Sequence, residues 1–192
     1  MNKHISIAVL AAAAALCSSP ALALTFEGAT TQGATVATPY VGNSLISFDL
    51  DFANAVPATL EFRIDEEDLL QPIAFNAILR NYTGRGIEGY ALSIDKGRFE
   101  TVGTVVRQFA GSTQVSANAG LATMYFNTPE FLDIEIGNAL GTTLGAVNWT
   151  LAGLQAGDRI SLTVSAVPEA STVALLLAGL LVAGRVQRRR QG

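Results

Sequence analysis

The chain has 192 residues, of which 49% are hydrophobic and 15% are charged, and its mean hydropathy is +0.36. A soluble domain usually has about a quarter of its residues charged, and a disordered chain lacks this many apolar residues. The composition therefore excludes a disordered chain and one that is soluble along its whole length. The length allows one domain of ordinary size, with the apolar excess in segments outside it.

The net charge of −4 is unevenly distributed along the sequence. Residues 24–167 contain fifteen acidic and seven basic residues, a balance of −8, whereas residues 185–190 contain four arginines and no acid. A nucleic-acid-binding domain presents Lys and Arg on its folded surface. The charge distribution therefore argues against nucleic-acid binding.

Residues 1–23 have the pattern of a secretory signal peptide, which predicts an N-terminal signal helix. Lys3 and His4 precede an apolar run over residues 5–16, and Ala21 and Ala23 form a small-x-small cleavage site. The run is shorter than the ~20 residues of a membrane span. An alternative is a lipoprotein acylated at Cys17. Such cysteines usually follow a small residue, whereas Cys17 follows Leu16.

Cleavage after Ala23 removes Cys17 and His4, the only cysteine and histidine of the chain. The predicted mature chain therefore has no disulfide, no thiolate nucleophile, no Ser-His-Asp triad and no zinc site with His or Cys ligands. Its domain must be held together by its hydrophobic core alone.

The body alternates apolar and polar residues, which is typical of strands with one buried face. The clearest segments are 46–52, 60–64, 132–136, 147–151 and 159–166, and weaker ones are 73–80, 89–94, 101–109 and 121–126. Turn signals such as residues 81–84, 95–97 and 156–158 separate them. Nine or ten strands over residues 24–166 predict an all-β domain, an antiparallel β-sandwich or jelly roll.

Four consecutive acids follow one predicted strand: Asp65, Glu66, Glu67 and Asp68. Clustered oxygen ligands could bind Ca²⁺, which takes 6–8 of them. The segment has no EF-hand spacing, and the alternative is a solvated acidic turn. No other cofactor is expected.

Two further groups of side chains are candidates for binding or catalysis. Asp49 and Asp51 lie on one face of a strand, where they could serve a glycoside hydrolase or simply keep an exposed face soluble. The aromatic residues that could stack on sugar rings are Tyr40, Tyr82, Tyr90, Tyr125 and Trp149. Trp149 lies on the apolar side of its alternation and is predicted to be core, so Tyr82, in a turn, is the best candidate for sugar contact.

The C-terminus has three parts in order. A short motif is followed by the apolar run 172–184, which predicts a short transmembrane helix, and then by the basic tail 185–192. The arginines are expected to stop transfer and stay on the cytoplasmic side, leaving the body outside. The motif is Val167, Pro168, Glu169, Ala170 and Ser171, and the arginines are Arg185, Arg188, Arg189 and Arg190.

This tail resembles the PEP-CTERM sorting signal of Gram-negative bacteria, over residues 167–192. Ala170 stands where the usual motif has a second proline. The resemblance implies recognition of Pro168 and Glu169 by an exosortase, a membrane-embedded cysteine transpeptidase, in an organism that makes exopolysaccharide. The alternative is a plain tail anchor.

The sequence thus predicts an exported, non-catalytic protein of the cell surface or extracellular matrix, associated with exopolysaccharide or biofilm. Its expected partners are signal peptidase, exosortase, the membrane before processing, and a polysaccharide. It would pass from an inner-membrane intermediate to the outer membrane, cell surface or matrix. The alternatives are a carbohydrate-binding module and an acid-dependent glycoside hydrolase.

Overall fold

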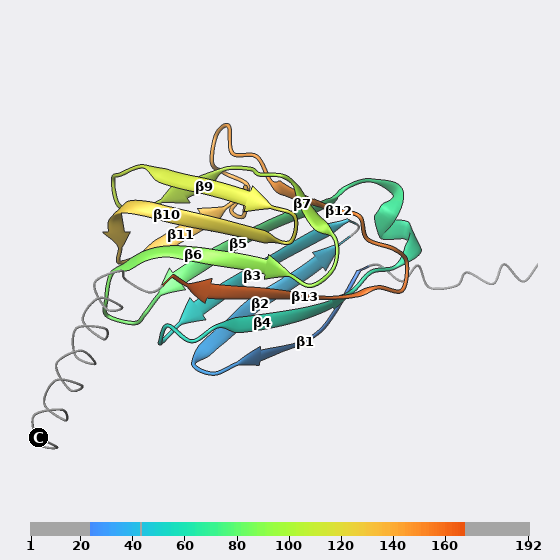
Figure 1. The fold of residues 1–192 in the computed structure, drawn as a ribbon, viewed down its shortest axis with the longest axis horizontal. Coiled ribbons are helices and arrows are strands. Elements are labelled where there is room, and N and C mark those ends of the chain that lie inside the picture. Colours follow the sequence, from blue (N-terminus) through green and yellow to red (C-terminus); the bar gives the residue numbers. More distant parts are fainter. Residues whose placement is uncertain (1–23, 43, 168–192) are drawn as a thin grey trace, which may run out of the picture.

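The computed structural model describes residues 24–42 and 44–167, which form two facing β-sheets (Figure 1). The first sheet has the order β1-β4-β13-β6-β10-β9. Its strands are β1 (Thr25–Thr31), β4 (Ala58–Arg63), β13 (Arg159–Ala166), β6 (Ile87–Ile94), β10 (Leu121–Glu130) and β9 (Thr113–Asn118).

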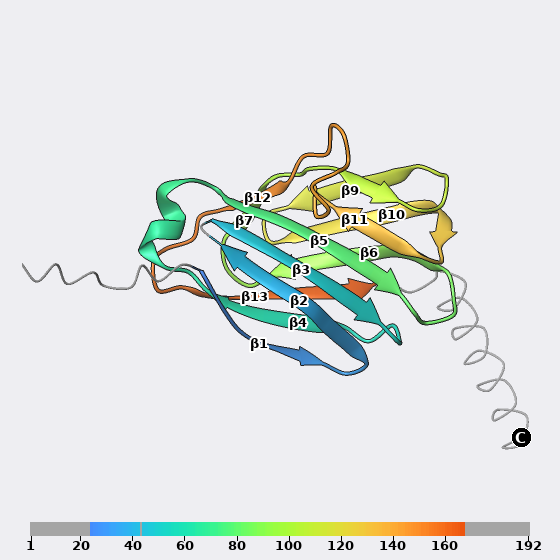
Figure 2. The same cartoon turned by 180° about the vertical axis from the view of Figure 1, so that it is seen from behind.

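The second sheet lies behind the first, and Figure 2 shows it from its own side. Its main order is β2-β3-β5-β11-β8, and β12 also pairs with β5 and in turn with β7. These strands are β2 (Ala34–Gly42), β3 (Leu45–Phe52), β5 (Ile73–Asn81), β11 (Asp133–Ile136), β8 (Val105–Arg107), β12 (Trp149–Ala152) and β7 (Arg98–Thr101). A short 3₁₀ helix, η1 (Glu66–Leu70), connects β4 to β5.

The predicted all-β class is confirmed, and one pairing differs from the expected antiparallel pattern. β3 and β5 are parallel, whereas the other strand pairs of the described chain are antiparallel. The reason is that β4, which lies between them in sequence, belongs to the other sheet. The chain crosses to that sheet and returns in its original direction.

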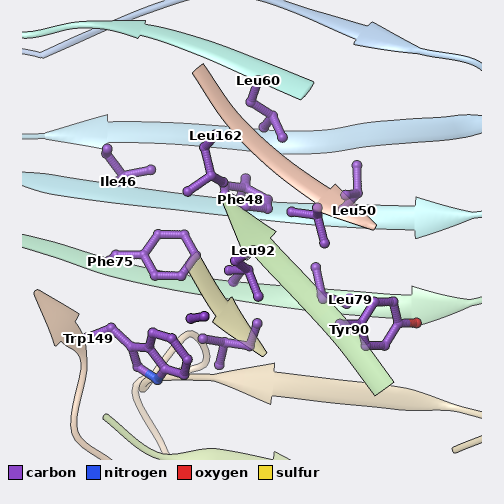
Figure 3. Packing of buried hydrophobic residues seen from close by; sticks show 14 of the residues in the cluster. Ile46, Phe48, Leu50, Leu60, Phe75, Leu79, Tyr90, Leu92, Trp149 and Leu162 are labelled. Carbon is purple, nitrogen blue, oxygen red and sulfur yellow. The ribbon is translucent and has the colours of Figure 1, made fainter. Parts of the chain in front are cut away.

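The core lies between the two sheets and is made by alternate residues of their strands. Every second residue of β3 is buried, and in β13 the same alternation buries Ile160, Leu162 and Val164, as a strand with one buried face requires. Side chains from both sheets point toward one another, among them Phe48, Phe75, Leu92, Trp149 and Leu162 (Figure 3). Trp149 is 0% exposed, which confirms its predicted place in the core.

The described residues form thirteen strands, more than the nine or ten predicted. The sequence prediction missed β1, β2 and β9, which carry few large apolar residues, and treated residues 101–109 as one strand. β7 and β8 are separate strands because they pair with different partners, β7 with β12 and β8 with β11. Between them, the carbonyl oxygen of Thr104 accepts a hydrogen bond from the indole of Trp149 (3.2 Å). The chain passes so close to the indole that a Cβ on Gly103 would lie 2.7 Å from the ring.

A buried ion pair joins the two sheets at one end of the sandwich. Arg107 of β8 donates from Nε to Glu130 of β10 (3.2 Å), and their side chains are 3% and 1% exposed. The guanidinium also donates to the carbonyl oxygen of Thr128 and lies 4.6 Å from the ring centre of Phe126. The pair is thus surrounded by hydrogen-bond partners, the condition under which a buried charge is tolerated.

Replacing Glu130 tests how strongly this pair stabilises the fold. Glu130→Ala leaves the Arg107 guanidinium buried without its carboxylate, so the free energy of unfolding should fall by about 3–5 kcal/mol. Urea unfolding followed by the emission of Trp149, the one tryptophan, measures this loss. Glu66→Ala, on the exposed face of η1, is the control and should change stability by less than about 0.5 kcal/mol. A similarly small change for Glu130→Ala would contradict a stabilising role.

Candidate functional site

The outer face of the second sheet carries a row of polar side chains across three strands. Tyr40 of β2 lies opposite Ser47 of β3, and Ser47 lies opposite Asn76 of β5. Because the neighbours of Ser47, Ile46 and Phe48, are buried in the core, the row faces away from it. Tyr40 is 58% exposed and therefore available to a ligand.

Part of this face is covered by the connection between β11 and β12, residues 137–148. Asn76 donates from Nδ2 to Oδ1 of Asn148 (3.3 Å), which also accepts the backbone N–H of Asn138 (2.8 Å). The carboxylate of Glu135 accepts the backbone N–H of Leu140 (3.0 Å) and the hydroxyl of Thr143 (2.8 Å). These bonds fix the connection on one half of the face and leave Tyr40 and the charged half open.

The open half holds one arginine among three carboxylates. The strand register places Arg80 of β5 between Asp51 of β3 and Asp133 of β11. Its guanidinium donates to Asp49 and to Asp51 (3.0 Å), and Nε lies 3.9 Å from Asp133. The hydrogen bond to Asp49 raises the pKa of Arg80 above its ordinary value, against the opposing effect of burial. The cluster carries a net charge of −2 when all four groups are ionised.

This arrangement argues against Asp49 and Asp51 as the acid–base pair of a glycoside hydrolase. Such a pair lies on opposite sides of the scissile bond, and here the guanidinium of Arg80 binds both carboxylates. Burial raises the pKa of the Asp133 carboxyl, an effect that Arg80 partly opposes. The cluster is therefore suited to charge pairing and hydrogen bonding on a surface.

Tyr82, the predicted sugar contact, follows β5 at the edge of this charged half. Its ring is 63% exposed, which confirms that it is accessible. The turn is fixed by buried Asn81, whose Oδ1 accepts the backbone N–H of Thr83 (3.0 Å) and whose Nδ2 donates to the carbonyl oxygen of Glu130 (3.0 Å). Asn76 and Tyr82 are six residues apart, so the Tyr40 row and Tyr82 are separated by roughly 20 Å along the strand.

The other aromatic candidates do not join this surface. Tyr90 is 1% exposed in the core, where burial raises the pKa of its phenol. Tyr125 is 48% exposed on β10, which belongs to the first sheet. Tyr40, by contrast, had no distinguishing signal in the sequence, because its position beside Ser47 and Asn76 depends on pairing between distant strands.

The acidic segment forms η1, and the predicted solvated turn is wrong for Asp68. Its carboxylate is buried (0% exposed) and accepts the backbone N–H groups of Ser44 (3.2 Å) and Asp65 (3.0 Å). Glu66 and Glu67 are exposed. Within residues 24–42 and 44–167, no three Asp, Glu, His or Cys side chains are placed to hold a metal ion. Calcium binding at this segment stays a prediction.

A cavity of about 330 Å³ lies beside η1, away from the charged cluster. It is lined mainly by apolar residues of η1 and of the β12 end, with Glu100 as its charged group: Leu69, Leu70, Pro72, Glu100, Leu151 and Leu154. Its lining offers no pair of titratable groups for catalysis.

The predicted processing sites lie outside the described residues, apart from Val167. These are Ala21, Ala23, Pro168, Glu169, Ala170, Ser171, Arg185, Arg188, Arg189, Arg190 and the predicted terminal helices. In the part of the chain that the structure describes, no helix is both long enough and apolar enough to cross a bilayer. The backbone N–H of Val167 donates to the carbonyl oxygen of Gly89 (2.9 Å).

Comparison with known proteins identifies no relative of this chain. The chain matches no family model, no curated protein and no solved structure. The site is therefore interpreted from its own residues.

Two aspartates with opposite pKa shifts test the electrostatics. The pKa of Asp133 is raised, so its ionisation costs stability as the pH rises through the interval above the ordinary aspartate value. The pKa of Asp158 is lowered by the backbone N–H of Gln155 and by Lys96, so its ionised form contributes stability that is lost as the pH falls through the lowered value.

Asp133→Asn should therefore raise Tm at neutral pH, and Asp158→Asn should lower it. Both differences should disappear in acid, once the carboxyl groups of the unmodified protein are protonated. Thermal unfolding across a pH series measures both variants under identical conditions. Shifts of the same sign at neutral pH would contradict this assignment.

Proposed function

We propose that the protein is an exported, non-catalytic component of the cell surface or extracellular matrix, delivered by a PEP-CTERM-type tail. The observation that carries this proposal is the direct junction between domain and tail. β13 ends at Ala166, and Val167, the first residue of the sorting motif, is hydrogen-bonded to Gly89. The fold thus reaches the motif without a spacer.

The other end of the domain supports the same delivery route. Leu24 is 2% exposed and packs in the core, and β1 begins at Thr25, directly after the predicted signal-peptidase site. A domain whose first and last residues adjoin the two predicted processing sites can be released by cleavage at both. Signal peptidase acts first, and exosortase then acts on the membrane-held intermediate.

The proposal includes the finer features of the fold and location. These are a signal helix within residues 1–23, a transmembrane helix at 172–184 and a jelly-roll connectivity of the sandwich. The destination is the outer membrane, the surface or the exopolysaccharide matrix. The non-catalytic role is supported by the binding of both Asp49 and Asp51 to Arg80.

Processing of the tail tests this proposal. In a Gram-negative host that carries an exosortase, the full chain should lose its C-terminal segment, which intact-protein mass spectrometry detects. Glu169→Ala should leave at least tenfold more unprocessed chain, because the motif carboxylate is lost, whereas Gln191→Ala in the basic tail should be processed normally. Deleting the exosortase gene should block processing of the unmodified chain and of Gln191→Ala. Normal processing without the enzyme, or of Glu169→Ala with it, would contradict the proposal.

Carbohydrate binding is a second candidate, favoured by the exposed rings at the two ends of the open outer face. Tyr40 and Tyr82 are 58% and 63% exposed, and the Arg80 cluster lies between them. Tyrosine rings stack on apolar faces of ligands while their hydroxyls remain hydrated. Their separation of roughly 20 Å suits an extended polymer better than a single sugar.

Alanine substitutions distinguish this face from the rest of the surface. If the face binds the exopolysaccharide of the producing cell, Tyr40→Ala and Tyr82→Ala should each weaken retention about tenfold, a loss of ~1.4 kcal/mol, in affinity electrophoresis. Tyr125→Ala removes a similarly exposed tyrosine from the opposite sheet and is the matched control. Equal retention of all three variants would rule out binding through this face.

A further inference from the structure

The strand pairing brings five connections to the end of the sandwich where β13 ends. In Figure 1, β5 and β13 both point toward this end, and η1 lies at the other. We call it the tail end, because Val167 leaves the domain there beside Gly89. Its connections are residues 32–33, 53–57, 82–86, 108–112 and 131–132.

The tail end differs in charge from the rest of this acidic domain. Its five connections contain no Asp or Glu, and Arg85 is their one charged residue. The connections at the opposite end contain six acids: Asp65, Glu66, Glu67, Asp68, Asp95 and Asp158. The negative charge of the loops is therefore concentrated away from the point where the tail begins.

Several large apolar side chains of these connections are exposed. Tyr82 (63% exposed), Phe109 (45%), Phe131 (49%) and Leu132 (53%) come from three of the five connections. In the described part of the chain, Phe109 and Phe131 are the exposed phenylalanines, and their ring centres lie 5.8 Å apart. We call these four residues the aromatic cluster.

The buried Glu130 carboxylate holds the backbone of this cluster in place. Oε1 accepts the N–H groups of Phe131 and Leu132 (3.1 Å each), and Oε2 accepts that of Phe109 (3.3 Å). The connection at 82–86 packs against the same ring, since a Cβ on Gly86 would lie 2.8 Å from Phe131. The exposed rings are thus supported by a preformed scaffold.

The acids nearest to the tail end in the strands are partly neutralised. Asp51 and Asp133 share the guanidinium of Arg80, and Glu130 is paired with Arg107. Glu88, near the start of β6, is half-buried. The five connections therefore present aromatic, apolar and uncharged polar side chains with one exposed cation, Arg85, and the Arg80 cluster beside them keeps a net charge of −2.

We infer that the tail end lies against the lipid bilayer, with the aromatic cluster in the headgroup region. The inference rests on the proposed membrane insertion of residues 172–184, since Pro168 to Ser171 leave only four residues between the domain and that segment. Four residues span at most about 14 Å. Aromatic rings favour the membrane–water interface, and the one charged residue of the five connections, Arg85, is a cation, the charge that anionic lipids attract.

Spin labels at two leucines of opposite ends test this contact in the full chain from Leu24 to Gly192. That chain has no cysteine, so single labels can be placed without background. Leu132→Cys labels the aromatic cluster, and Leu70→Cys labels an exposed leucine (86%) on η1 as the matched control. Leu176→Cys reports on the apolar run. The protein is reconstituted in vesicles of phosphatidylcholine and phosphatidylglycerol, and collisions with oxygen and with a water-soluble nickel chelate are measured.

The label at 132 should collide with nickel several-fold less, relative to oxygen, than the label at 70. Equal nickel access at 132 and 70, with the label at 176 inside the bilayer, would overturn the inference and leave the membrane tail intact. A label at 176 exposed to nickel would instead contradict the proposed tail insertion and, with it, the inference. Protection at 132 that is lost when the protein is diluted in excess lipid would indicate contact with a second copy and would also overturn it. Unchanged Trp149 emission verifies that each variant is folded.

Discussion

The buried pair between Arg107 and Glu130 connects the fold to the surface of the molecule. It joins a strand of each sheet, and the same carboxylate accepts three backbone N–H groups from the connections that carry Phe109, Phe131 and Leu132. A buried charge requires such partners, because an unpaired one is strongly destabilising. The hydrogen bonds that stabilise the buried Glu130 carboxylate therefore also hold the connections of the tail end in place.

The strand order determines where the tail leaves the domain. β13 is a central strand of the first sheet, paired on both sides with β4 and β6, and its last residue adjoins the predicted sorting motif. The acid-free connections lie at the same end of the domain as Val167, and the acidic connections lie at the opposite end.

Much of the fold could be predicted from the sequence, because alternation depends on neighbours in the chain. Apolar alternation predicts β3, β4 and β13, and the same pattern places Trp149 in the core. β1 and β9 escaped prediction because they have few large apolar residues and depend on pairing with β4 and β10.

The candidate sites depended more strongly on long-range contacts. The exposure of Tyr82 followed from turn chemistry, whereas the Arg80 cluster requires the parallel register of β3 and β5, which no local pattern specifies. No local pattern distinguishes Asp68 from the three other acids, because its buried carboxylate accepts a hydrogen bond from Ser44, which lies 24 residues earlier in the chain. The proximity of Phe109 and Phe131 likewise follows from the meeting of β8 and β10 connections.

In the proposed arrangement, the folded domain sits directly on the membrane, without a spacer, through its tail end. Neutron reflectometry of the full chain from Leu24 on a supported bilayer of phosphatidylcholine and phosphatidylglycerol measures this arrangement most directly. The account predicts a protein layer that begins within the lipid headgroups, with its long dimension away from the bilayer. A hydrated layer between the headgroups and the protein would contradict it.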